Sequence, residues 1–130
     1  DGEITEENGT MYFLDNQAKL RIPSDKAEKI RACEALEGKH ITMGIRPEDF
    51  YDPDFIRTDD REELQEFAGT VENVEPMGAE TYVYLTTGKA PYIARVDPHV
   101  KAEFDEEKTL IVNMNKSHFF EPGEMGSLIT

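Results

Sequence analysis

The feature of this sequence that most constrains its fold is a series of short segments in which apolar and polar side chains alternate. In the clearest of them, Thr81, Val83 and Leu85 alternate with aromatic or polar neighbours. Successive side chains of a β-strand point to opposite faces of a sheet, so this period of two predicts half-buried strands. Glycines and an Asp-Pro step separate the segments and provide turns. The predicted strands are Phe67–Val74, Glu80–Thr86, Pro91–Val96 and Thr109–Met114.

The first part of the chain predicts a hairpin followed by one helix. Met11–Leu14 and Lys19–Ile22 are β-prone runs separated by four turn-forming residues. Ser24 is a suitable N-cap for a helix over Asp25–Glu37, in which apolar residues recur at helical spacing. Gly38 follows directly, where helices commonly end.

A strand and a long acidic loop follow the helix. His40–Arg46 reads as a strand that Pro47 ends by removing a backbone donor. Glu48–Glu66 holds nine acidic side chains and two arginines, which predicts a solvated loop with a helical turn at Arg61–Glu66. Several short, closely spaced strands predict a mainly β fold, either a small barrel or a sandwich.

The length of 130 residues is close to that of a common single domain, so we expect one compact core. Within it we expect opening strands over 1–23, the helix over 24–38 and the barrel over 39–130. The sequence starts at Asp1 without an initiating Met or a signal-like apolar run. We therefore expect a segment of a longer chain.

Charge excludes several classes of partner. The chain has 28 acidic and 14 basic side chains, a formal net charge of −14 that repels phosphate backbones and anionic lipids. Its longest apolar runs are three or four residues, whereas a membrane-spanning helix needs roughly 20. The single Cys33 cannot form an internal disulfide, which favours a reducing compartment. We expect a cytoplasmic protein that neither binds nucleic acid nor inserts into a membrane.

Nucleotide and calcium motifs fail in this sequence. Gly38-Lys39-His40 and Gly88-Lys89-Ala90 lack the glycines and the Ser or Thr of a phosphate-binding loop. Asp52-Pro53-Asp54 begins like a calcium loop, but Arg57 stands where the turn glycine is required. We expect no cofactor and no metal site.

No catalytic group is predicted either. His40, His99 and His118 lie in different segments without metal-ligand spacing. Ser117 and His118 are adjacent, so on a strand they would point to opposite faces and could not act as a catalytic pair. Cys33 falls on the apolar stripe of the predicted helix, which favours a small buried side chain over a reactive thiolate.

Three tyrosines leave two interpretations open. Tyr82, Tyr84 and Tyr92 could form a platform for stacking nucleic-acid bases. The basic groove that such a platform needs is missing, so a barrel surface or a protein contact is favoured.

Three motifs occur in order along the chain, and together they carry a resemblance. They are Gly44–Asp49, Val71–Val83 and His118–Pro122. This combination resembles the C-terminal regulatory region of the ATP-binding subunits of maltose-type and multiple-sugar ABC importers. The motif positions that we single out as structural or interface candidates are Gly44, Arg46, Pro47, Glu48, Gly69, Glu75, Gly78, Glu80, His118, Phe119 and Phe120.

The resemblance implies an oligonucleotide-binding (OB) type barrel, the transport-associated (TOBE) domain, behind a nucleotide-binding domain. ATP and Mg²⁺ would belong to that absent domain, so no site residue is carried over for them. The implied partners are the nucleotide-binding domain, the membrane permease subunits and a second copy, at the inner face of the membrane. The alternative is an OB-type domain that binds a small oxyanion, as related barrels in molybdate systems do.

The chemistry of individual motif residues leads to further expectations. Gly69 permits a bend or bulge in the first barrel strand, and Gly78 permits a turn with positive φ. Arg46 and Glu48 flank a strand end that an ion pair could hold. For self-association we expect a surface formed by the barrel strands and the last segment, because apolar and aromatic side chains are enriched at protein interfaces. It should include some of Met77, Tyr82, Tyr84, Phe119 and Phe120, with Met77, Tyr82 and Tyr84 as the main candidates.

Overall fold

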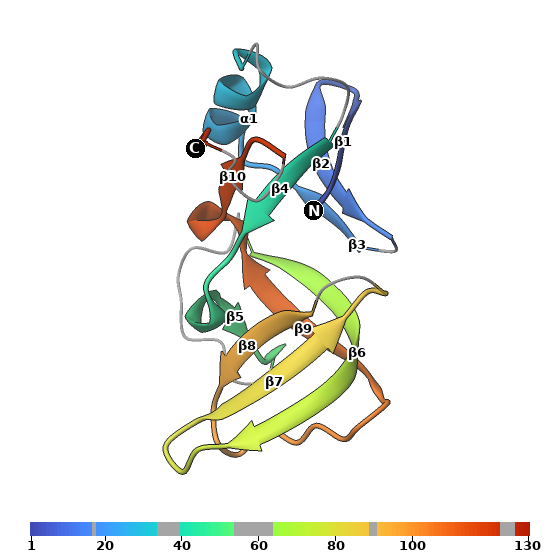
Figure 1. Cartoon of the computed structure of the whole chain (residues 1–130), viewed down its shortest axis with the longest axis vertical. Helices are drawn as coiled ribbons and strands as arrows, with labels where there is room; N and C mark the ends of the chain where they lie inside the picture. The colour runs from blue at the N-terminus through green and yellow to red at the C-terminus, as the bar shows by residue number, and fades with distance from the viewer. Residues whose placement is uncertain (17, 34–39, 54–63, 89–90, 123–126) are drawn as a thin grey trace. The chain divides into compact units, whose positions relative to one another are not determined.

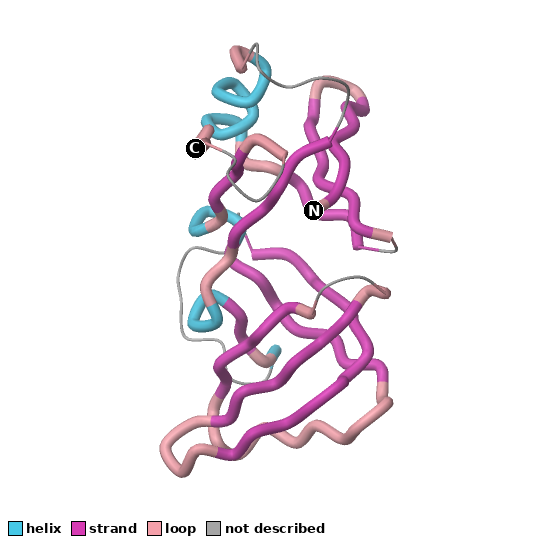
Figure 2. Tube along the Cα trace, in the orientation of Figure 1, coloured by secondary structure: helices cyan, strands magenta, loops and turns pink. Residues whose placement is uncertain are grey.

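The computed structural model describes residues 1–16, 18–33, 40–53, 64–88, 91–122 and 127–130, and most of them lie in strands (Figure 2). These residues form two compact units (Figure 1). Unit 1 comprises residues 1–45 and 114–130, and unit 2 comprises residues 46–113. In the described part of the chain each unit contains one five-stranded antiparallel sheet.

Unit 1 is built from strands at both ends of the chain. Its sheet has the order β10-β4-β1-β2-β3. The 3-10 helix η4 (Met114–Lys116) leads into β10. The strands are β1 (Gly2–Glu7), β2 (Thr10–Asp15), β3 (Ala18–Arg21), β4 (His40–Gly44) and β10 (His118–Phe120).

The predicted hairpin is confirmed as β2–β3, but the strand before it was missed. In β1 acidic side chains alternate poorly with apolar ones, so its periodicity is weak. The feature that indicated β1 was the turn after it. Asn8 and Gly9 join Glu7 to its partner Thr10, and both have positive φ, 52° and 83°. An Asn-Gly pair is the preferred sequence for such a two-residue hairpin turn.

The helix is shorter than the sequence predicted. Helix α1 spans Ser24–Arg31, and Pro23 occupies the N-cap, because the Ala27 N–H donates to its carbonyl at 2.9 Å. Ser24 is therefore the first helical residue and not the cap. Cys33 lies beyond the helix and is half-buried, so its predicted place on the buried stripe is wrong. The predicted stop at Gly38 lies outside the described residues.

Unit 2 begins with the 3-10 helix η1 (Pro47–Asp49) and contains a sheet of order β5-β9-β6-β7-β8. Strand β8 also lies beside η1 and β5, so the sheet nearly closes into a barrel. A mainly β, OB-like fold with an N-terminal hairpin and one short helix is thus confirmed. The strands are β5 (Phe50–Tyr51), β6 (Leu64–Pro76), β7 (Thr81–Thr86), β8 (Tyr92–Val96) and β9 (Glu107–Asn113).

The predicted helical turn at Arg61–Glu66 is wrong for residues 64–66, the part of it that the structure describes. Leu64, Gln65 and Glu66 open strand β6 and pair with β9. Their partner strand β9 is distant in the sequence, so no local pattern predicts that these residues form a strand. Residues 61–63 lie outside the described part.

Each unit has its own apolar core, whereas the chain length predicted one. Strands before Arg46 pair with each other and with β10, while residues 46–113 pair among themselves. The core of unit 1 includes Phe13, Leu20, Ile30, Ile41, Met114 and Phe119. The core of unit 2 includes Phe50, Phe67, Val71, Val83, Leu85, Leu110 and Val112.

Candidate interaction surface

The outer side of strand β7 presents two tyrosines. Thr81, Val83 and Leu85 face the interior of unit 2 and are at most 4% exposed, which confirms the predicted alternation. Tyr82 and Tyr84 point to the opposite side and are half-buried. The register places Glu75 of β6 and Arg95 of β8 on either side of Tyr82.

Hydrogen bonds and charges hold these tyrosines in place. The Tyr82 hydroxyl donates to Glu80 Oε1 at 3.3 Å, and Arg95 Nε lies 3.2 Å from Glu80 Oε2. A hydrogen bond to Glu75 raises the pKa of Tyr84 above its ordinary value of 10.0, and burial adds to the rise. Both phenols are therefore positioned hydrogen-bond donors.

Ile93, opposite Tyr84 and 38% exposed, adds apolar area to this surface. We call Glu75, Tyr82, Tyr84, Ile93 and Arg95 the tyrosine face. It is an aromatic sheet face with paired charges, a composition suited to a protein contact. It lacks the row of free cations that a nucleic-acid platform needs.

The turn beside the tyrosine face exposes Met77. Its side chain is 58% exposed, and its N–H donates to the Glu80 carbonyl at 2.8 Å. Gly78 has φ +86°, so the positive φ predicted there is confirmed. Met77, Tyr82 and Tyr84 thus belong to one hairpin, as the self-association hypothesis requires.

The other aromatic candidates lie in unit 1 and pack inside it. Phe119 is fully buried, with its ring centroid 6.1 Å from that of Phe13, so it is not one of the surface residues. Phe120 is half-buried and lies over Gly44, where a Cβ would stand 3.0 Å from its ring. His118 is exposed and pairs with Gly44. Gly44 of the first motif therefore packs against His118 and Phe120 of the third, and this contact is structural.

The remaining motif positions are structural as well. Pro47 begins η1, and the Asp49 N–H donates to the Arg46 carbonyl at 3.0 Å. Within the described chain no ion pair joins Arg46 to Glu48, so backbone hydrogen bonding holds this loop.

Gly69 permits close packing instead of the bulge predicted there. A Cβ at this position would lie 3.1 Å from the Thr86 carbonyl oxygen and 3.2 Å from Leu85 Cβ. The register shift in β6 falls between Val71 and Asn73. The bulge therefore lies further along β6 than Gly69, where it was predicted.

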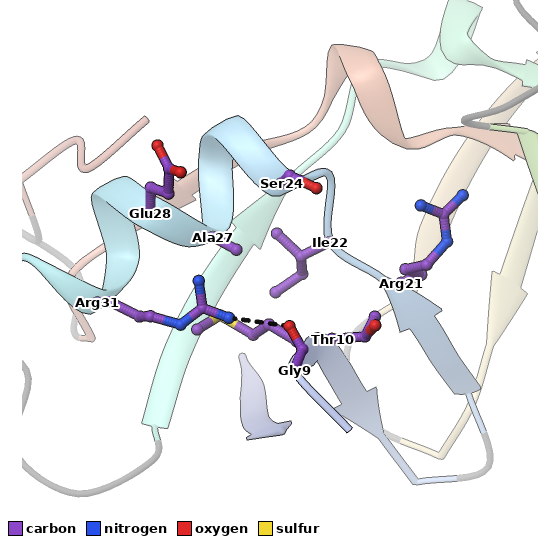
Figure 3. A pocket seen from close by; sticks show the side chains of 9 residues that line it. Gly9, Thr10, Arg21, Ile22, Ser24, Ala27, Glu28 and Arg31 are labelled. Atoms are coloured by element: carbon purple, nitrogen blue, oxygen red, sulfur yellow. Dashed lines mark hydrogen bonds between the residues drawn. The ribbon is translucent and has the colours of Figure 1, made fainter. Parts of the chain in front are cut away.

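Unit 1 contains a surface pocket of about 170 Å³ that the sequence did not indicate (Figure 3). Met11, Ile22 and Ala27 lie beneath it between α1 and the neighbouring strands and are at most 3% exposed, so its accessible lining is mostly polar. Arg31 runs along one side and donates to the Gly9 carbonyl at 3.4 Å. Thr10, Arg21, Ser24 and Glu28 complete the lining of this arginine pocket.

Sequence analysis also missed Phe104, which is 77% exposed. A signal for it existed, because this lone phenylalanine stands between Glu103 and Asp105 in an otherwise acidic stretch. Such a neighbourhood is unusual for a core residue.

The three histidines are exposed, and the described residues contain no group of three potential metal ligands. None of the described helices combines the length and apolar content needed to cross a bilayer.

Comparison with known proteins defines the class of this fold. Residues 1–50 match the model of the MalK OB fold domain, and residues 43–120 match that of the TOBE domain. The chain therefore belongs to the TOBE domain family, with a MalK-type OB segment at its start. This is not the fold of a catalytic ATPase domain.

Individual relatives agree with this family. The chain is 29% identical over 104 residues to the oligosaccharides import ATP-binding protein MsmX of Bacillus subtilis, covering 80% of the chain and 28% of MsmX. It is 31% identical over 109 residues to the putative uncharacterized ABC transporter ATP-binding protein YcjV of Escherichia coli K12, covering 84% and 28%. The chain thus spans 28% of the length of these relatives.

A solved structure shares the fold. The cytoplasmic molybdate-binding protein ModG, in its molybdate-bound form, superposes with a TM-score of 0.59 at 15% identity. The match covers 93% of this chain and 91% of that one. At this identity the likeness concerns the fold alone.

Proposed function

We propose that this chain is the accessory regulatory domain of the ATP-binding subunit of an ABC carbohydrate importer. The observation that carries the proposal is the pair of family matches, which run in order over residues 1–50 and 43–120. Relatives named as import ATP-binding proteins share this region and extend well beyond it. ATP binding and hydrolysis, with Mg²⁺, belong to the remainder of the full-length subunit.

The role of this chain in the proposal is packing and contact. Its motif residues pack against each other, as Gly44 does with Phe120, or shape turns, as Gly78 does. The proposal assigns it no catalytic residue. Its full-length partners are the nucleotide-binding domain and the permease subunits, on the cytoplasmic side of the membrane.

The proposal also includes contact with a second copy through the tyrosine face. Tyr82 and Tyr84 are half-buried, positioned by Glu80 and Glu75, and next to the exposed Met77. Aromatic side chains of restricted mobility lose little conformational entropy when an interface forms.

The gene provides the direct test. The coding sequence upstream of Asp1 is expected to encode a phosphate-binding loop and an ABC signature. In the full-length subunit, deletion of the segment that begins at Asp1 should leave basal ATP hydrolysis while transport regulation or assembly is lost. An upstream region without ATP-binding motifs would refute the assignment.

A second candidate function is binding of a small oxyanion. The observation in its favour is the fold shared with a molybdate-binding protein over 93% of this chain. Calorimetric titration with molybdate, tungstate and sulfate tests it. Heat that saturates at one ion per chain would support oxyanion binding over the regulatory assignment.

A further inference from the structure

The turn between β1 and β2 contains the one Asn-Gly step of the sequence, Asn8-Gly9. Asparagine is among the thermolabile residues, because its side-chain amide carbon can be attacked by the backbone nitrogen of the next residue. Glycine in that next position has no side chain to shield the nitrogen. The reactivity of such a step then depends on how the fold surrounds it.

The fold leaves this step accessible. Asn8 and Gly9 are both exposed, and a Cβ built on Gly9 would meet no atom of the described residues within 4 Å. Glu7 and Thr10 form the last pair of the β1–β2 ladder, so the peptide bond between Asn8 and Gly9 lies beyond it. Neither burial nor strand pairing therefore protects the Gly9 nitrogen.

The other four asparagines of the sequence are less favourably placed for this reaction. The Val74 N–H donates to Asn73 Oδ1 at 2.9 Å, and valine branches at Cβ beside the nitrogen that would have to attack. Asn113 is 3% exposed. Asn16 and Asn115 are each followed by a residue with a long side chain. The sequence and the structure together thus single out Asn8.

The same turn is a junction of unit 1. Glu7 Oε2 lies 2.8 Å from Lys19 Nζ of β3. Arg31 of α1 pairs with Glu6 and donates to the Gly9 carbonyl at 3.4 Å (Figure 3). Strand β1 itself lies between β4 and β2 in the sheet. A change in the length of the turn therefore acts on the middle of this sheet.

We propose that Asn8 is a site of spontaneous deamidation, and that its isoaspartyl product loosens the β1–β2 hairpin. The Gly9 nitrogen gives its proton to solvent and forms a bond to Asn8 Cγ. The bond from Cγ to Nδ2 breaks, and Nδ2 takes a proton from solvent and leaves as ammonia. Water then opens the cyclic imide, so each event consumes one water, releases one ammonia and involves no oxidation or reduction.

The two products differ in their effect on the hairpin. Cleavage of the imide at Cγ gives aspartate, and Asp-Gly suits a two-residue turn as Asn-Gly does. Cleavage at the backbone carbonyl gives isoaspartate, which routes the main chain through the side chain and adds a methylene to it. Glu7 and Thr10 then lose the spacing that their pairing requires. Both products add one negative charge to a chain at −14.

The test follows the chain during incubation in a mildly alkaline buffer, where the backbone nitrogen loses its proton more readily. Peptide mass spectrometry locates the conversion of amide to acid. Purified protein isoaspartyl methyltransferase with labelled S-adenosylmethionine measures isoaspartate, because the enzyme methylates that carboxylate. Asn8→Gly is the unreactive control, since Gly-Gly also suits this turn, and Asn8→Asp supplies the aspartyl product.

Conversion should occur at Asn8 before any other asparagine, and Asn8→Gly should lose most of the methyl label that wild type gains. The isoaspartyl form, separated by chromatography, should unfold at a lower urea concentration than wild type, whereas Asn8→Asp should unfold close to wild type. Three results would each overturn the proposal: earlier conversion at another asparagine, equal labelling of Asn8→Gly, or an isoaspartyl form with the urea midpoint of wild type. None of these outcomes depends on the importer assignment.

Discussion

At the scale of single residues, Phe119 and Phe120 show why burial cannot be read from residue type. They are adjacent in β10, yet Phe119 is fully buried against Phe13 and Phe120 is half-buried over Gly44. Adjacent strand residues face opposite sides, and only the neighbouring strands decide which side becomes a core.

Phe119→Ala should lower the free energy of unfolding by about 3–5 kcal/mol, because it leaves a cavity in the core of unit 1. Leu128→Ala, at a residue 62% exposed, should change it by less than about 0.5 kcal/mol. Urea denaturation measures both. A loss below about 1 kcal/mol for Phe119→Ala would contradict its burial.

Cys33→Ala should have a small effect, because Cys33 is half-buried and lies beyond α1. The expected change in unfolding free energy is at most about 1 kcal/mol. Denaturation of the variant under reducing conditions provides the measurement, with the wild type in parallel. A functional defect at unchanged stability would point to a reactive thiol.

At the scale of elements, strand alternation predicted β7 well and β1 poorly. β7 has buried and half-buried side chains in strict succession, so its period of two is visible in the sequence. The acidic strand β1 has no such pattern, although the Asn8-Gly9 pair after it is typical of a hairpin turn. The start of β6 was also missed, because its pairing with β9 is a long-range contact.

The hydrogen bond between Glu75 of β6 and Tyr84 of β7 should be detectable in the titration of the Tyr84 phenol. Its pKa is raised first by the hydrogen bond to Glu75, then by burial. The stability contributed by this bond is therefore complete below pH 10.0 and is lost as pH rises through the raised pKa.

Glu75→Gln should lower the pKa of Tyr84 toward its ordinary value, because the carboxylate that opposes phenolate formation is removed. The ultraviolet absorbance of phenolate follows the titration, and Tyr84→Phe identifies the signal of this residue. Glu72→Gln, at an exposed acid of the same strand, is the matched control. Equal shifts in the two glutamine variants would exclude the specific hydrogen bond.

At the scale of the whole molecule, the family assignment predicts that the chain has no saturable ATP binding. No segment of the sequence has the pattern of a phosphate-binding loop. Equilibrium dialysis with Mg²⁺ and ATP measures this directly. Saturation at one nucleotide per chain would contradict the prediction.

Net charge should oppose the self-association that we propose for the tyrosine face. Two copies at −14 repel each other, so association should strengthen as salt screens the charge. Sedimentation at low and high ionic strength tests this, with Tyr82→Ser expected to weaken the association at high salt. A strict monomer at high protein and salt concentration would leave dimerisation to other parts of the subunit.

The sequence by itself determined the mainly β class, the β2–β3 hairpin, the turn at Gly78 and the TOBE family, because these depend on local periodicity, turn chemistry and ordered motifs. Only the tertiary structure decided that there are two cores, that Phe119 is buried and Phe104 exposed, and that Arg31 lines a pocket. Those properties depend on which strands pair across long stretches of chain, and the free energy of such pairing is a sum over contacts that no local segment contains.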